Sequence, residues 1–220
     1  AVPSSTITQV GCNGESTGAV DVVVNGGTPP YSYLWSNGAT SEDISAVPAG
    51  LYDLTVTDSL GCTATYQARV DEPAAINPLV SGFFDYNNVS CYGGSNGEAT
   101  ITITGGTPPF SYVWSNGSVD SLITGLIAGP YEVSIIDANG CSQIANLTIT
   151  EPDSLYGVVQ STSTYNGLYN ISCHGASDGY IDVEIYGGTP PYSYSWSNGD
   201  NQQDVNNVAA GNYTLTVTEI

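Results

Sequence analysis

Five cysteines are the residues of this chain best suited to covalent chemistry, and their spacing is regular. Cys12 and Cys62 lie 50 residues apart, and the same spacing separates Cys91 from Cys141. Regular cysteine pairs in small domains are typical of disulfides made in an oxidising compartment. We therefore predict one disulfide in each complete module, the unit of about 80 residues that the chain repeats. We expect Cys173 to be unpaired, because the chain ends before a partner at the same spacing. No CxxC spacing supports the alternative of a metal–thiolate site.

Acidic residues at one recurring position are the candidates for binding a cation. They are Asp58, Asp137 and Glu219. Calcium takes roughly six to eight oxygen ligands from several such groups, and the sequence has no DxDxDG loop to supply them. Two interpretations stay open at this position, a carboxylate that stabilises a turn or a calcium site at the junction of two modules. No other cofactor is expected.

Aromatic residues also recur along the chain, the tryptophans at spacings of 79 and 82 residues. The tryptophans are Trp35, Trp114 and Trp196. Because large rings dominate the cores of small domains, we expect these indoles at the module centres. Later in each copy a tyrosine begins a strand, at Tyr52, Tyr131 and Tyr213. This placement is similar to the tyrosine corner of immunoglobulin-like domains, whose hydroxyl bonds the backbone upstream. The alternative is that exposed tyrosines and loop acids bind carbohydrate.

Catalysis is not expected of these modules. The single histidine, His174, has no counterpart in the other copies, and no lysine is present to act as a base or nucleophile. We therefore predict that the chain is not an enzyme.

The charge excludes two classes of partner. Arg69 is the only cation against 21 acids, which gives a formal net charge of −20. Such a surface repels nucleic acid and anionic membranes. No apolar run reaches about 18 residues, so direct membrane insertion is not expected. The charge fits solubility and mutual repulsion between copies, or neutralisation by divalent cations.

Three copies of one segment organise the rest of the chain: GGTPPYSYLWSNGA from Gly26, GGTPPFSYVWSNGS from Gly105 and GGTPPYSYSWSNGD from Gly187. The stretch before each copy alternates apolar and polar residues, as at Val20 and Val22, which is typical of a half-buried antiparallel strand. Asn-Gly turns bound such strands, and no helical periodicity occurs. The sequence therefore predicts an all-β chain of tandem immunoglobulin-like β-sandwich modules. We place them at 1–73, 74–152 and 153–220, the third ending before its last strand.

The recurring order Cys, Asp/Asn-Gly, GGTPPYSYxWSNG, AGxY, VTD and Gly-Cys resembles the SprB repeat of Bacteroidetes surface proteins. The resemblance covers all three modules. It implies a secreted, non-enzymatic segment of a large cell-surface adhesin or filament, exported by type IX secretion and acting as a semi-rigid stalk in attachment or gliding. Its partners would be neighbouring repeats and a surface polysaccharide or substratum. Bacteria of this phylum also O-glycosylate Asp-Ser/Thr-hydrophobic motifs, which here would modify Ser59, Ser121 and Ser154.

Overall fold

The computed structural model describes residues 2–82 and 89–219, and every regular element among them is a β-strand. The chain divides into two compact units. Unit 1 comprises Ala1–Val80, Ile101–Ser121 and Glu132–Asn146, and unit 2 comprises Ser81–Thr100, Leu122–Tyr131 and Leu147–Ile220. Below, repeats 1, 2 and 3 denote residues 1–73, 74–152 and 153–220, boundaries that stay a prediction. Among the described residues, no helix is long and apolar enough to cross a membrane.

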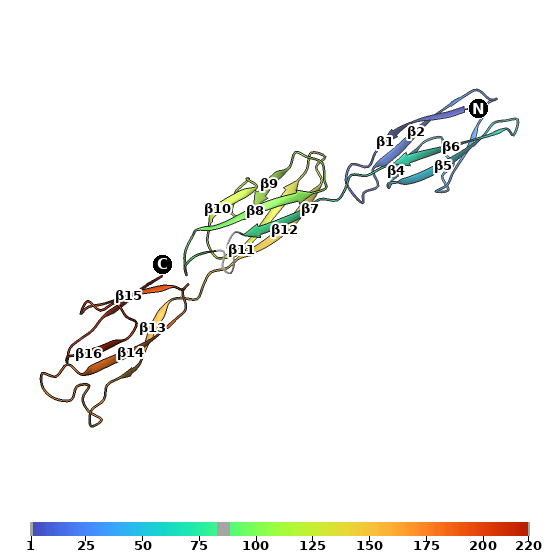
Figure 1. Ribbon diagram of the computed structural model, residues 1–220. Coiled ribbons are helices and arrows are strands. Elements are labelled where there is room, and N and C mark those ends of the chain that lie inside the picture. The colour runs from blue at the N-terminus through green and yellow to red at the C-terminus, as the bar shows by residue number, and fades with distance from the viewer. Residues whose placement is uncertain (1, 83–88, 220) are drawn as a thin grey trace. The chain divides into compact units, whose positions relative to one another are not determined.

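Repeat 1 forms two antiparallel three-stranded sheets (Figure 1). One sheet has the order β1-β2-β4, with β1 at Val2–Thr8, β2 at Gly18–Asn25 and β4 at Ile44–Val47. The other has the order β3-β5-β6, with β3 at Ser32–Trp35, β5 at Gly50–Thr57 and β6 at Thr63–Val70. These orders correspond to the A-B-E and C-F-G strands of an immunoglobulin sandwich. The predicted fold class is therefore confirmed.

The core of repeat 1 follows from the alternation of its strands. In β2, Val20 and Val22 are buried, and in β5 every second residue from Tyr52 to Val56 is buried. Trp35, at the end of β3, is only 2% exposed. Because successive side chains of a strand point to opposite faces, one face of each sheet supplies this core and the other faces solvent.

Repeat 2 has the same strand orders as repeat 1. One sheet has the order β10-β8-β7, with β7 at Asn77–Gly82, β8 at Gly97–Thr104 and β10 at Leu122–Leu126. The other has the order β12-β11-β9, with β9 at Ser111–Trp114, β11 at Gly129–Ile136 and β12 at Ser142–Ile149. The sequence predicts a strand from Ala74 to Asn88, of which β7 forms the middle, and residues 83–88 lie outside the described residues.

Repeat 3 has one strand fewer among its described residues. Its first sheet has the order β13-β14-β16, with β13 at Tyr156–Thr162, β14 at Gly179–Tyr186 and β16 at Val205–Val208. Its second sheet pairs only β15 (Tyr192–Trp196) with β17 (Leu215–Glu219). No counterpart of β6 lies among the residues described for this repeat, so one edge of β17 has no partner strand there.

In repeats 2 and 3, the glycine that begins the signature lies against the segment that leads in from the preceding repeat. Gly105 has φ +73°, and a Cβ there would lie 2.0 Å from the carbonyl oxygen of Ala75. Gly187, at φ +68°, would meet the carbonyl oxygen of Ser154 at 2.1 Å. Only glycine tolerates both the backbone conformation and this close approach. The backbone N–H groups of the next glycines bond the same segments, from Gly106 to Ala74 at 2.9 Å and from Gly188 to Asp153 at 2.7 Å.

The disulfide connectivity differs from the predicted one. The disulfide among the described residues joins Cys12 to Cys141, with Cα atoms 5.5 Å apart, while Cys62, Cys91 and Cys173 are free and exposed. The predicted pairs Cys12–Cys62 and Cys91–Cys141 are therefore wrong. In repeat 1 the loop of Cys12 lies beside the last residues of β6, since Val10 N–H bonds the Asp71 carbonyl, whereas Cys62 directly precedes β6.

The length of β6 separates the two cysteines of repeat 1. Eight residues of strand span about 26 Å at roughly 3.3 Å each. A disulfide needs Cα atoms within about 7 Å of each other. A bond within one repeat would therefore break the β5–β6 ladder, and the bond between successive repeats does not.

Candidate functional site

The junction of repeats 1 and 2, which lies wholly in unit 1, combines a disulfide, side-chain hydrogen bonds and a cavity, and we take it as the candidate site. Here the loop around Cys12 (residues 10–17) meets the turn at residues 137–141 of repeat 2. We call the first the cysteine loop and the second the tip turn, and we use these names for the equivalent segments of the other repeats. Besides the disulfide, the Asn139 side-chain N–H donates to the Gly11 carbonyl at 3.1 Å. The Asn13 side-chain N–H donates to the Pro73 carbonyl at 3.0 Å. A cavity of about 340 Å³ lies between these segments.

A buried carboxylate shapes each tip turn. Asp137 is 6% exposed, and its two oxygens accept backbone N–H bonds from Thr107, Asn139 and Cys141 at 2.9–3.0 Å. Burial acts to raise the pKa of Asp137, but these donors outweigh it and hold the pKa below its ordinary value.

Asp58 does the same in repeat 1. It accepts backbone N–H bonds from Cys62, Leu60 and Thr28 at 2.9–3.2 Å. The Cys62 N–H is the largest cause that lowers the pKa of this carboxyl. These oxygens are thus engaged by the turn, and no group of three or more His, Cys, Asp or Glu side chains gathers among the described residues. The arrangement favours the turn-stabilising interpretation, and the calcium alternative stays a prediction.

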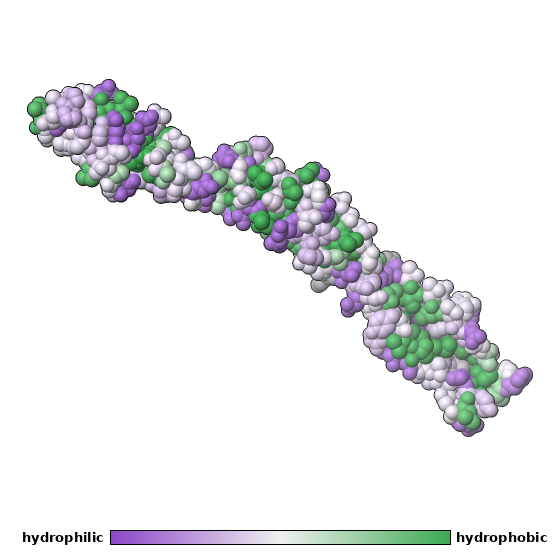
Figure 2. Space-filling model, turned by 180° about the vertical axis from the view of Figure 1, so that it is seen from behind, coloured by the Kyte–Doolittle hydropathy of each residue, from purple (hydrophilic) through white to green (hydrophobic). Residues whose placement is uncertain are grey.

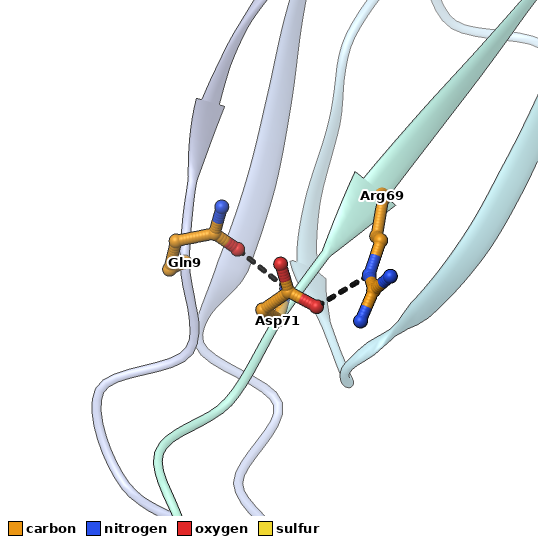
Figure 3. Close-up of polar contacts among 3 residues, drawn as sticks. All are labelled: Gln9, Arg69 and Asp71. Carbon is orange, nitrogen blue, oxygen red and sulfur yellow. Dashed lines mark hydrogen bonds and ion pairs between the residues drawn. The ribbon is translucent and has the colours of Figure 1, made fainter.

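The cysteine loop of repeat 1 is fixed to the end of β6. The Asp71 N–H donates to Gln9 Oε1 at 2.5 Å, and Arg69 Nε lies 2.6 Å from Asp71 Oδ1 (Figure 3). The Gly14 N–H donates to Glu72 Oε2 at 2.7 Å. These bonds hold the loop beside the segment that leaves the repeat, which positions Cys12 at the junction.

The junction of repeats 2 and 3, which lies in unit 2, reuses these parts. The Gly93 N–H donates to Glu151 Oε2 at 2.6 Å, as Gly14 does to Glu72. The carbonyl of Ser90, which precedes Cys91 as Gly11 precedes Cys12, accepts the Thr189 hydroxyl at 3.1 Å. Cys91 itself is free and exposed. Glu219 stands at the position of Asp58 and Asp137, and its Oε2 is buried without a hydrogen-bond partner among the described residues.

The tryptophans lie in the repeat cores. Trp35, Trp114 and Trp196 are 2%, 2% and 5% exposed. Each indole N–H donates to a backbone carbonyl six residues on, at 2.9–3.0 Å, those of Ser41, Asp120 and Gln202. With the N–H satisfied and the ring covered, these indoles pack as core residues and leave no face for a sugar.

The tyrosines at the start of each late strand bond upstream backbone. Their hydroxyls donate to carbonyls four residues earlier, Tyr52 to Pro48 at 2.8 Å, Tyr131 to Ile127 at 3.1 Å and Tyr213 to Ala209 at 2.9 Å. This is the geometry of a tyrosine corner.

The two signature tyrosines of repeat 1, Tyr31 and Tyr33, are half-buried and hydrogen-bonded. Tyr31 donates to the Gly26 carbonyl at 2.9 Å, and Tyr33 donates to Glu42 at 2.9 Å. Burial, followed by this bond to the Glu42 carboxylate, raises the pKa of Tyr33 to about 12. Both rings pack against the core of repeat 1. They stabilise the fold and do not form an open aromatic platform.

Residues that suggest catalysis or modification lie apart from one another. His174 is exposed beside the free Cys173, on the edge of a cavity of about 680 Å³ in repeat 3. The letters Gly-x-Ser-x-Gly occur around Ser16, Ser95 and Ser177, but each run leads directly into a strand, whereas a nucleophile elbow needs a strand followed by a helix.

In the view of Figure 2, hydrophobic residues form broad areas on the C-terminal part of the chain, at the lower right.

Three proposed glycosylation residues are accessible. Ser59, Ser121 and Ser154 are all exposed in turns or loops. The Ser59 hydroxyl donates to the Thr28 carbonyl at 2.9 Å. Their modification stays a prediction.

Sequence reasoning missed the residues that make the junction. Thr107, Thr189 and Asn139 were not singled out, although the first two belong to the GGT that opens every signature. Glu72 and Glu151 stand in a Glu-Pro pair that recurs near the ends of repeats 1 and 2. Identity between copies at positions outside the core is the signal that points to the threonines and glutamates, whereas Asn139 has Leu60 as its counterpart in repeat 1 and carries no such signal.

The strand orders, the indole on β3 and the tyrosine corner on β5 together define tandem immunoglobulin-like β-sandwich modules. The family model of the SprB repeat matches residues 4–40, 84–119 and 169–201. The chain therefore carries three SprB repeats, a module that occurs in Bacteroidetes adhesins.

Solved structures with similar folds are distant. The C-terminal 282-residue fragment of intimin, in complex with the translocated intimin receptor (Tir) intimin-binding domain, is 12% identical, with 78% of this chain and 68% of that one covered and a TM-score of 0.39. Domains 4–9 of the surface layer protein SbsC are 12% identical, covering 100% and 43%, with a TM-score of 0.32. An amphioxus IgVJ-C2 molecule is 15% identical, covering 66% and 96%, with a TM-score of 0.29. No curated protein matches the sequence.

Proposed function

We propose that this chain is a non-enzymatic segment of a large, secreted cell-surface adhesin or filament, in which tandem repeats act as a semi-rigid stalk in surface attachment and gliding. The observation that carries the proposal is the junction in unit 1, where repeat 2 is held to repeat 1 by the linker and also by a disulfide. Two connections between neighbouring modules restrict their relative rotation, which a single flexible linker does not do.

Hydrogen bonds to the linkers support the same proposal. The segments at Ala74 and Asp153 are bonded to the glycines of the following signature, so neither linker runs free of the module it enters. The close approach of the incoming backbone to Gly105 and Gly187 adds to this argument. A stalk needs such fixed linkers because reach is lost when modules fold back on one another.

Double electron–electron resonance on the 220-residue chain tests the stalk directly. Cys62 and Cys91 are free and exposed, so they take spin labels once Cys173→Ser removes the third thiol. We expect one narrow distance distribution with the Cys12–Cys141 disulfide intact. A broad distribution, like that of modules on a flexible linker, would overturn the proposal. The matched control is the same chain with both Cys12→Ser and Cys141→Ser, which has no disulfide between the repeats. Labelled at Cys62 and Cys91 in the same way, it should give a broader distance distribution.

The alternative, carbohydrate binding by tyrosines and loop acids, has less support because the signature rings are half-buried and the hydroxyls of Tyr31, Tyr33, Tyr192 and Tyr194 are hydrogen-bonded. A glycan array with the purified chain distinguishes the two functions. Binding that Tyr33→Phe and Glu42→Gln abolish would favour the binding module over the stalk.

We also propose that export places the chain outside the cell and that Ser59, Ser121 and Ser154 carry glycans there. Their exposure and their Asp-Ser-Leu context support this. Intact-mass measurement of the protein from its native source should give a mass above that of the bare sequence. A mass equal to the bare sequence would reject glycosylation and leave the stalk untouched.

A further inference from the structure

We propose that the SprB repeats of this chain are linked in series by disulfides, each cysteine loop bonding the tip turn of the next repeat. The bond between Cys12 and Cys141 is then one instance of a general rule. Cys91 and Cys173 are loop half-cystines that take a tip-turn cysteine of a following repeat, and Cys62 is a tip-turn half-cystine that takes a loop cysteine of a preceding one.

The first step of the argument is the bonded junction in unit 1. Cys12 is presented by a loop that Gln9, Glu72 and the Asp71 carbonyl fix to the end of its own repeat. Cys141 is presented by a turn that Asp137 fixes at the start of the next repeat. Both cysteines are thus positioned by groups within their own repeats.

The second step is that the same positioning groups recur around the free cysteines. Around Cys91, Glu151 bonds the Gly93 N–H and the Val89 N–H bonds the Thr150 carbonyl, as Glu72 and Asp71 do in repeat 1. Around Cys62, Asp58 makes the tip turn with the same three kinds of N–H bond as Asp137. Cys91 and Cys62 are therefore held by the same kinds of bonds as the two bonded cysteines.

The third step is that the junction in unit 2 already brings the next repeat to Cys91. The Ser90 carbonyl accepts the Thr189 hydroxyl, so the signature of repeat 3 touches the backbone next to Cys91. At the first junction the Gly11 carbonyl accepts Asn139, which also donates to Thr107, the counterpart of Thr189. At both junctions the carbonyl before the loop cysteine therefore accepts a side-chain hydrogen bond from the next repeat, and no tip-turn cysteine lies among the described residues of repeat 3.

Bond formation is ordinary thiol–disulfide exchange. Each of the two thiols loses a proton, and their two electrons reduce a small-molecule disulfide, which leaves as two thiols. The structure supplies the positioning, and an oxidising compartment supplies that disulfide.

The experiment supplies the missing tip turn. Residues 139–152 are grafted after Ile220, so that Glu219 takes the place of Asp137 and a grafted cysteine takes that of Cys141. After refolding with oxidised glutathione, alkylation and non-reducing peptide mapping should find the grafted cysteine bonded to Cys91. The parent chain has three free thiols, and the grafted chain should have two despite its additional cysteine.

Two controls separate the rule from a folding failure. A graft with serine in place of cysteine should keep three free thiols and the Cys12–Cys141 bond. The grafted chain with Cys91→Ser should leave the grafted cysteine as a free thiol. A bond between the grafted cysteine and Cys173, a free grafted thiol in the presence of Cys91, or a Cys12–Cys62 peptide from the parent chain would each overturn the proposal. The spin-label distances that test the stalk are a separate readout, so either proposal can fail without the other.

Discussion

Repeat 1 and repeat 3 carry almost the same signature, but the cores that surround it differ in size. Among the described residues, the buried cluster of repeat 1 has eleven members and that of repeat 3 has four. Trp35 and Trp196 are alike, at 2% and 5% exposed, whereas Leu54 is fully buried and its counterpart Leu215 only partly. The signature therefore positions the indole, and other residues close the core around it.

The last strand accounts for the difference. In repeat 1, β6 pairs with β5 along its whole length and contributes Ala68 and Val70, which are 0% and 1% exposed. A Cβ on Gly18 would lie 2.5 Å from Val70, so that space is filled. In repeat 3, a Cβ on the equivalent Gly179 would still lie 2.9 Å from the Val208 carbonyl oxygen, but no counterpart of Val70 lies among the described residues and Gly179 borders a cavity of about 680 Å³. The last strand thus decides how large a core forms around the signature.

The largest effect should come from removing the two indoles in turn. Trp35→Ala should lower the free energy of unfolding of repeat 1 by about 3–5 kcal/mol, because it empties a site that is closed on all sides. Trp196→Ala should cost less, since the residues packed around this indole, such as Tyr213 and Leu215, are only partly buried. Hydrogen exchange followed by mass spectrometry reports each repeat separately. Equal losses of protection in both repeats would contradict the importance we give to β6.

Alanine in place of the first glycine of the signature should destabilise repeat 3 more than repeat 1, which is the reverse of the order expected for the tryptophans. Gly26 and Gly187 have φ of +73° and +68°, so alanine strains the backbone at both by roughly 1–2 kcal/mol. Only at Gly187 does the new Cβ also meet a carbonyl oxygen, that of Ser154. We therefore expect Gly187→Ala to cost distinctly more than Gly26→Ala in the same exchange experiment. A larger cost at Gly26 would show that the incoming segment does not press on the signature.

Much of the fold could be read from the sequence because strand periodicity and turn chemistry are local. Alternation at Val20 and Val22, the indole at Trp35 and the tyrosine at Tyr52 all lie where a sandwich requires them. Half-burial of the other signature rings could not be predicted in the same way, because it depends on which strands cover them.

The cysteine pairing could not be read from spacing in a periodic chain. Cys62 and Cys141 hold the same place in successive repeats, so a regular spacing from Cys12 fits a bond to either one. What decides is that Cys12 and Cys62 lie at opposite ends of β6, which is a property of the folded sheet. The contact of Asn139 with the Gly11 carbonyl could not be predicted for the same reason, since it joins residues of different repeats.

Removing the tip-turn carboxylate should change the response to acid. The pKa of Asp58 is lowered in the folded protein, so its stabilising effect is present above about pH 4 and is lost as the pH falls through the folded value. Asp58→Asn should therefore unfold at a lower temperature than the parent at pH 7, and the difference should narrow below about pH 4. Calorimetry across this range measures both. A difference that stays constant down to pH 2 would contradict the role assigned to the carboxylate.

The smallest effect should come from the one cation of the chain. Arg69 and Asp71 form an ion pair with side chains 74% and 52% exposed, and exposed pairs contribute only about 0–1 kcal/mol. Arg69→Gln should therefore change the stability of repeat 1 by less than about 0.5 kcal/mol and lose what effect it has in high salt. Asp71 keeps its backbone bonds to Gln9 and Val10 in this variant, so the cysteine loop should stay in place. A loss of the Cys12–Cys141 bond in Arg69→Gln would mean that the charge, and not the backbone, positions the loop.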